Sequence, residues 1–255
     1  MTTAGGGAHE APGGPGGGGG GAPGAAARRN ELATRLEQVR ARIARAMEAA
    51  GRTEEPALVV VTKFFPASDV DLLAELGVTA IGENRDQEAA AKCAELAHRD
   101  RLSVHFIGQL QSNKAASVAR YADVVQSVDR AKVAGALDRA ASMAGRPLEV
   151  TVQVNLDAAQ GRGGVAPGEA RELADLVASS PMLTLRGVMA VAPLGGDARA
   201  AFALLREVAD GIRGDHPAAT WVSAGMSGDL EAAVAEGATH LRVGSAILGS
   251  RQSHR

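Results

Sequence analysis

The sequence has 255 residues, a formal net charge of −2 and a hydrophobic fraction of 45%, which is typical of a globular protein. Its basic residues are scattered and it has only one Trp, one Tyr and four Phe, so it lacks the basic patches and stacking platforms that nucleic-acid binding requires. No apolar run reaches the roughly 20 residues that cross a bilayer, and the single cysteine, Cys93, excludes an internal disulfide and fits a reducing cytoplasm.

The chain begins with a low-complexity segment. Residues 1–27 are almost entirely Gly, Ala and Pro, and such a composition buries too little apolar surface to offset the entropy of ordering it. The segment also lacks the charged start and the continuous apolar stretch of a secretory signal. We therefore expect residues 1–27 to form a disordered tail and residues 28–255 to form a single domain.

The rest of the chain alternates between helical and strand patterns. An amphipathic helix is predicted first, at 30–50, because its apolar residues recur every three or four positions. Short apolar runs predict strands at 57–61, 78–81, 103–107, 124–127, 149–155, 185–191, 220–223 and 240–243. Helices are predicted between them at 69–76, 87–97, 114–121, 130–144, 169–179, 199–212 and 229–236. Ser68 and Asp71 are spaced as an N-cap pair for the helix at 69–76.

Eight strands that alternate with helices predict a (β/α)8 barrel, with the helix at 30–50 as an addition that covers the wall. The strands are continuously apolar, which suits a parallel sheet covered by helices. An open, doubly wound sheet would alternate in the same way, but it rarely needs eight short strands without a large insertion.

Polar residues follow the predicted strands, and in a parallel barrel these positions meet at one rim. They are Lys63 after the first strand, Glu83 and Asn84 after the second, Gln109 after the third, Asn155 after the fifth, Ser223 and Ser227 after the seventh, and Arg242, Gly244 and Ser245 at the eighth. The convergence of these residues, rather than any one of them, predicts a functional site. His98, His216 and His240 show no metal-ligand spacing, so we expect no metal site.

Lys63 is the most informative of these residues. It follows an apolar strand and precedes Phe64 and Phe65, so its ammonium would be partly desolvated, which favours the neutral amine that attacks aldehydes. The alternative is a lysine whose charged end reaches solvent at the rim and stays hydrated.

The last two strand ends have the pattern of a phosphate site. Glycines and serines follow both strands, and loops in this part of a barrel bind phosphate through backbone N–H groups. Ser227 could also be the N-cap of the helix at 229–236, and a purely structural cap is the alternative for this residue. A nucleophilic lysine together with a phosphate cradle indicates an aldehyde that carries a phosphate, and pyridoxal 5′-phosphate fits that description.

Longer motifs surround these positions. They are Val61-Thr62-Lys63, Gly82-Glu83-Asn84-Arg85 with Gln87-Glu88, His105-Phe106-Ile107-Gly108-Gln109-Leu110-Gln111-Ser112-Asn113-Lys114, Arg186-Gly187-Val188-Met189, Gly225-Met226-Ser227 with Asp229, and Arg242-Val243-Gly244-Ser245-Ala246-Ile247-Leu248-Gly249. With them the chain resembles the pyridoxal phosphate homeostasis proteins, also called the proline-synthetase co-transcribed type. That family has the barrel of the alanine racemase N-terminal domain.

The resemblance implies a role for each residue of the site. Lys63 would form the Schiff base with the cofactor, and Arg242 would meet its pyridine nitrogen. Ser227, Gly244 and Ser245 would hold the phosphate, and Asn84 would line the pocket near the ring. Ser223 completes the expected cofactor-binding set, and the family favours a monomer.

An arginine beside the ring nitrogen bears on the chemistry, because a guanidinium cannot accept a proton and so leaves that nitrogen neutral. Carbanion chemistry is then poorly supported. Alanine racemases use a second base, a tyrosine from the C-terminal domain of a partner subunit, and we expect no counterpart here. We therefore expect a cytoplasmic protein that buffers or delivers pyridoxal phosphate, possible recipients being enzymes that lack it, without turning over an amino acid.

Two enzyme classes remain as alternatives. A pyridoxal-phosphate racemase or lyase would need an acid/base group on the other ring face, for which His105 and Glu83 are candidates. A Schiff-base aldolase would need its lysine on a later strand, commonly the sixth, where this chain offers Arg186 and Met189.

Overall fold

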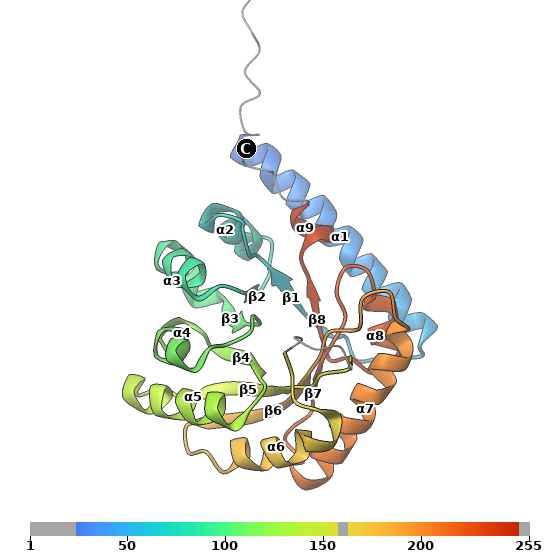
Figure 1. Cartoon of the computed structure of the whole chain (residues 1–255). Coiled ribbons are helices and arrows are strands. Elements are labelled where there is room, and N and C mark those ends of the chain that lie inside the picture. Colours follow the sequence, from blue (N-terminus) through green and yellow to red (C-terminus); the bar gives the residue numbers. More distant parts are fainter. Residues whose placement is uncertain (1–23, 158–162, 250–255) are drawn as a thin grey trace, which may run out of the picture.

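The computed structural model describes residues 24–157 and 163–249. Within them eight parallel strands close into a barrel in the order β1 to β8, and each strand pairs with its neighbours in sequence while β1 also pairs with β8. Helices surround the barrel, and α1 runs along the side formed by β8 and α8 (Figure 1). The (β/α)8 barrel with an additional N-terminal helix is thereby confirmed.

The strands are β1 Ala57–Val61, β2 Ala80–Glu83, β3 Ser103–Phe106, β4 Val124–Val128, β5 Leu148–Gln153, β6 Leu183–Met189, β7 Trp221–Ser223 and β8 His240–Val243. The helices are α1 Ala25–Ala49, α2 Ala67–Glu75, α3 Asp86–Glu95, α4 Ala115–Tyr121, α5 Ala131–Ala144, α6 Ala170–Ala178, α7 Ala198–Asp215, α8 Leu230–Ala235 and α9 Ser245–Leu248, with 3-10 turns at Arg99–Arg101, Ser112–Lys114 and Pro167–Glu169. No helix in this part of the chain has both the length and the apolar character that a membrane span requires.

The added helix α1 covers the barrel through one apolar stripe. Leu32, Leu36, Val39 and Ile43 are almost completely buried, and their spacing of three and four places them on one face of the helix. α1 begins at Ala25, three residues before the predicted domain boundary. Residues 1–23, on which most of the predicted disordered tail falls, lie outside the described residues.

The strand predictions were most accurate at the closure of the barrel, where β1 and β8 have the predicted bounds. The N-cap predicted for the second helix is wrong. Pro66 occupies the N-cap position of α2, and the Asp71 carboxylate instead accepts hydrogen bonds from the backbone N–H groups of Ala97 and His98. Asp71 therefore connects α2 to the segment after α3 and does not cap the start of its own helix.

A bulge in β6 makes a glycine necessary. Val150 of β5 pairs with Leu185, but the next residue, Thr151, pairs with Gly187, so one residue of β6 is extra. Gly187 has a φ of 146°, and a Cβ atom there would lie 2.0 Å from the carbonyl oxygen of Trp221. Only glycine fits this close approach of β6 to β7.

We expect Gly187→Ala to lower the free energy of unfolding by roughly 2 kcal/mol or more, because the new methyl group forces β6 and β7 apart. Gly211→Ala is the matched control. Gly211 lies within α7, its new Cβ would meet Arg171 at an ordinary 3.8 Å, and alanine favours the helix by about 0.5–1 kcal/mol. Urea denaturation of the two variants measures both effects, and equal stabilities would contradict the prediction.

Candidate functional site

Side chains along each strand alternate between the inside and the outside of the barrel. A Cβ atom on Gly82 would meet Val59 and Val61, so these three positions share one face. Val59 pairs with Arg242 and Gly82 pairs with His105, which places the same face inside the barrel. Lys63 and Asn84 follow the ends of these two strands, at the rim of the barrel.

The closure of the barrel brings the predicted residues of β1 and β8 together. Val60 pairs with Val243, and a Cβ atom on Gly244 would lie 3.1 Å from the carbonyl oxygen of Val61. The end of β8 therefore passes directly beside the strand that carries Lys63. Lys63 itself is half-buried, in a turn where the N–H of Phe65 donates to the carbonyl oxygen of Thr62 at 3.1 Å.

Two serines meet on the β7–β8 side of the rim. The Ser245 hydroxyl donates to the Ser227 hydroxyl at 3.3 Å, and the Ala246 N–H donates to the same Ser227 oxygen at 3.3 Å. The predicted N-cap role of Ser227 is wrong, because α8 begins at Leu230 with Asp229 as its N-cap. Ser227 instead joins the loop after β7 to the start of α9, a helix that the sequence did not predict.

Arg242 lies beneath the rim and is 3% exposed. Its Nη1 donates to the Ser223 hydroxyl at 2.6 Å and its Nη2 to the carbonyl oxygen of Ala190 at 2.7 Å. Burial lowers the pKa of Arg242 to about 10, so the guanidinium is still charged at neutral pH. The guanidinium is therefore a positive charge inside the barrel, and its hydrogen bonds to β7 and to the end of β6 fix its orientation.

A chain of hydrogen bonds runs from Arg242 across the interior of the barrel to His105. Ser223 accepts from Arg242, so its own proton is donated to the Gln126 Oε1 at 2.7 Å. The Gln126 Nε2 then donates to the His105 Nδ1, 2.8 Å away, which must be unprotonated to accept. His105 is therefore neutral with its proton on Nε2, and burial agrees by lowering its pKa to about 3. Gln126 was not predicted, although it is a polar residue within an apolar strand.

Aromatic rings and an arginine fill the barrel near the strand starts. Trp221 stacks on His105 with ring centroids 6.3 Å apart and contacts His240 at 4.1 Å. The Arg186 guanidinium lies 4.7 Å from the Trp221 ring. His105 is therefore a hydrogen-bonded residue of the packed interior, and it lies on the far side of Gln126 from Arg242.

Asn84 and Glu83 point in opposite directions. The Asn84 Oδ1 is buried without a hydrogen-bond partner among the described residues, and Asn84 lines a cavity of about 610 Å³ with Gln109 and Lys114. A buried acceptor of this kind is costly unless a ligand or water supplies a donor. The Glu83 side chain leaves the barrel on its outer face and contacts Lys92 of α3 at 2.6 Å.

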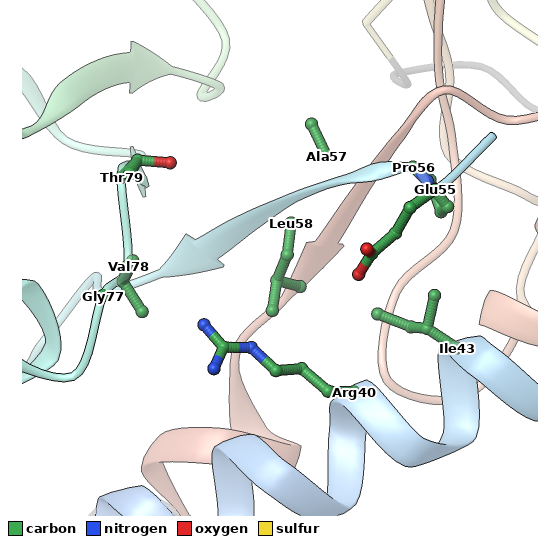
Figure 2. A pocket seen from close by; sticks show the side chains of 9 residues that line it. All are labelled: Arg40, Ile43, Glu55, Pro56, Ala57, Leu58, Gly77, Val78 and Thr79. Atoms are coloured by element: carbon green, nitrogen blue, oxygen red, sulfur yellow. The ribbon is translucent and has the colours of Figure 1, made fainter.

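A second cavity lies at the other end of the barrel. Figure 2 shows its lining, which comes from α1 and from the segments at the starts of β1 and β2. Its volume is about 280 Å³, and its lining residues are Arg40, Ile43, Glu55, Pro56, Ala57, Leu58, Gly77, Val78 and Thr79. None of the predicted site residues is among them, so the polar rim at the strand ends remains the candidate site.

Comparisons with known proteins agree with this architecture. The family model for the alanine racemase N-terminal domain matches residues 34–252. The chain is 44% identical over 201 residues to a pyridoxal phosphate homeostasis protein from Corynebacterium glutamicum, covering 76% of this chain and 90% of that one. A protein of the same name from Mycobacterium tuberculosis is 43% identical over 244 residues, covering 88% and 95%.

A solved structure is also similar. PipY of Synechococcus elongatus, determined with PLP bound, has 35% sequence identity and a TM-score of 0.76. The match covers 86% of this chain and all of the PipY chain. The residues matched by the family model, 34–252, include all eight strands of the barrel.

The two buried histidines predict an acid-sensitive fold. Burial lowers the pKa of His105 to about 3 and that of His240 to about 4, both from 6.5. Below pH 6.5 the unfolded chain binds protons at these imidazoles that the folded chain does not bind. The free energy of unfolding should therefore fall by about 1 kcal/mol per pH unit for each histidine, until the pH reaches its folded pKa.

Urea denaturation at pH 7 and at pH 5 measures this dependence. In His105→Gln one of the two groups is gone, so the loss of stability between these pH values should be smaller than in the wild type. His98→Gln, which replaces a half-buried imidazole outside the barrel interior, provides the matched control for the substitution itself. Equal losses in the wild type and in His105→Gln would contradict the assignment of His105 as a neutral buried group.

Proposed function

Since this chain belongs to the alanine racemase N-terminal domain family, and within it to the pyridoxal phosphate homeostasis proteins, we propose that it binds pyridoxal 5′-phosphate at the rim of the barrel, covalently through Lys63, and buffers or delivers the cofactor without turning over an amino acid. The observation that supports this proposal most strongly is that Lys63 follows β1 while Ser227, Gly244 and Ser245 follow the strands β7 and β8 at the same rim. The buried guanidinium of Arg242 lies beneath them. The bound PLP of PipY supports the same choice of cofactor.

The residues at the rim fit this cofactor. When bound, pyridoxal phosphate supplies an aldehyde, a phosphate group and a pyridine nitrogen. Lys63 offers the amine for the aldehyde. The hydroxyls of Ser227 and Ser245, which lie 3.3 Å apart, and the backbone of Gly244 would hold the phosphate. The Asn84 Oδ1 is buried without a partner among the described residues, and it could accept from a donor on the ligand or on a bridging water.

Arg242 would face the pyridine nitrogen. Ser223 and Ala190 hold its guanidinium from two sides, so it is oriented before the ligand arrives. Because its pKa is still about 10, it can donate a hydrogen bond but cannot take up a proton at neutral pH. The ring nitrogen would stay unprotonated, which weakens the electron withdrawal that carbanion chemistry needs. In this arrangement Ser223 contributes by orienting Arg242.

The two candidates for a second base are both engaged elsewhere. His105 accepts from Gln126 deep in the barrel, and burial keeps it neutral. Glu83 lies on the outer face of β2, where Lys92 and the Thr62 hydroxyl both contact it. Tyr121, the single tyrosine of the sequence, ends α4, on the side of the barrel where the strands start. These placements favour a carrier over a racemase or lyase.

A carrier of pyridoxal phosphate would need enzymes that receive the cofactor and a cellular compartment in which the transfer takes place. The recipients would be enzymes that lack their cofactor, and the transfer would take place in the cytoplasm, which a single cysteine supports. The family resemblance favours a monomer.

We expect wild-type protein mixed with pyridoxal phosphate to show a visible absorbance band that borohydride removes, with a mass increase located on Lys63. Lys63→Ala should lose both the band and the adduct, because it lacks the amine. Lys132→Ala is the matched control, since Lys132 is an exposed lysine on α5. A band that persists in Lys63→Ala would contradict the assignment of Lys63.

We also expect the loaded protein to leave amino acids unchanged. Incubation with either enantiomer of alanine, followed by chiral chromatography and a keto-acid assay, should give no more product than free pyridoxal phosphate gives. A faster rate in the wild type that Lys63→Ala lacks would establish an enzyme and overturn the carrier proposal.

A further inference from the structure

Two side chains of α3 hold the backbone on both sides of Lys63. The Lys92 Nζ donates to the carbonyl oxygen of Thr62 at 2.8 Å. The Glu88 Oε1 accepts a hydrogen bond from the backbone N–H of Phe64. Glu88 and Lys92 are four residues apart and so lie on the same face of α3. The peptide groups just before and just after Lys63 are therefore both attached to one helix.

The hydrogen bond between Glu88 and the Phe64 N–H restrains an unusual backbone conformation. Phe64 has a φ of 70° and is the one non-glycine residue with a positive φ in the part of the chain that the structure describes. A bulky aromatic residue rarely adopts this conformation unless its surroundings impose it. The hydrogen bond to Glu88 is such a restraint, and the Arg85 guanidinium, 5.1 Å from the Phe64 ring, is a second contact from the same side.

The hydrogen bond from Lys92 to Thr62 belongs to a buried cluster of polar groups that also includes Glu83. Lys92 is 6% exposed and Glu83 is fully buried. The Glu83 Oε1 accepts from the Lys92 Nζ at 2.6 Å and from the Thr62 hydroxyl at 2.6 Å. Both the hydroxyl and the carbonyl of Thr62 are thus bound, so the residue before Lys63 cannot rotate without breaking two hydrogen bonds in a region with little access to water.

We propose that Glu88 and Lys92 are positioning residues for Lys63: by fixing the peptide groups on its two sides, they set the direction in which its amine leaves the end of β1. The proposal rests on the proposed function, because the amine matters as the group that bonds to the cofactor. Glu88 also lines the cavity that contains Asn84, but the proposed role of both residues is on the backbone rather than on the ligand. They act through the backbone, while the pocket itself is built by β2, β7 and β8.

Glu88 is the better position for a test, because removing Lys92 would leave the buried Glu83 carboxylate without its cation and could unfold the protein. We expect Glu88→Ala to form the covalent adduct with pyridoxal phosphate roughly tenfold to a hundredfold more slowly than the wild type, since a misplacement of about 1 Å has a cost of that order. Its affinity for pyridoxamine 5′-phosphate, which lacks the aldehyde, should stay within about threefold, since that ligand forms no bond to Lys63.

Two further variants separate positioning from a general structural effect. Glu88→Gln keeps an oxygen that can accept from the Phe64 N–H, so it should recover most of the wild-type rate. Glu95→Ala removes an exposed carboxylate at the end of the same helix and should match the wild type. Hydrogen exchange at the Phe64 amide, measured without cofactor, should accelerate in Glu88→Ala by about tenfold or more, because its acceptor is gone.

The outcomes distinguish this proposal from the function on which it rests. If the wild type forms the adduct and Glu88→Ala forms it equally fast, the positioning role is wrong and the function stands. Parallel losses of adduct rate and of pyridoxamine phosphate affinity would also overturn it, because the whole pocket would then have changed. If the wild type forms no adduct while Phe64 exchange still accelerates in Glu88→Ala, the proposed function fails and the restraint on the backbone is real.

Discussion

The site depends on a charged guanidinium buried inside the barrel. A cation in this position is costly unless its donors find acceptors, and here two acceptors come from β7 and from the end of β6. Arg242 of β8 is held by Ser223 of β7 and by the carbonyl of Ala190 after β6, and the chain of bonds continues through Gln126 of β4 to His105 of β3. The direction of each bond is determined by the one before it, because arginine can only donate.

This hydrogen-bond network also explains why aromatic rings surround His105 in the barrel interior. His105 must be neutral to accept from Gln126, and the rings of Trp221 and His240 surround it with surface that disfavours a charge. The packed rings fill the barrel near the strand starts, so the polar groups are concentrated toward the strand ends. There Lys63 and Asn84 follow the ends of β1 and β2 at the rim, and the end of β8 brings Gly244 against β1.

Much of this could be predicted from the sequence, because the fold is encoded in local patterns that repeat. The strands β1 and β8 are unbroken apolar runs with clear ends, and the residues that follow strands must gather at one rim in any parallel barrel. The role of Glu83 could not be predicted, because its direction depends on which face of β2 is turned inward. Gln126 was missed for a similar reason, since its partners on β3 and β7 become neighbours only when the barrel closes. The four-residue helix α9 is too short to show a periodicity.

In the proposed function, the same residues that would bind the cofactor would also limit its reactivity. A carboxylate beside the pyridine nitrogen would share a proton with it and stabilise a carbanion, whereas Arg242 would supply only a donor, since its guanidinium stays charged at neutral pH. His105, which could in principle move a proton, is committed to Gln126 and is kept neutral by burial. Binding and catalysis place different demands on a pyridoxal-phosphate site, and the hydrogen-bonded Arg242 and Ser223 would serve the first. A carrier needs that combination, because the lysine has to hold the cofactor reversibly while the rest of the site leaves its chemistry unused.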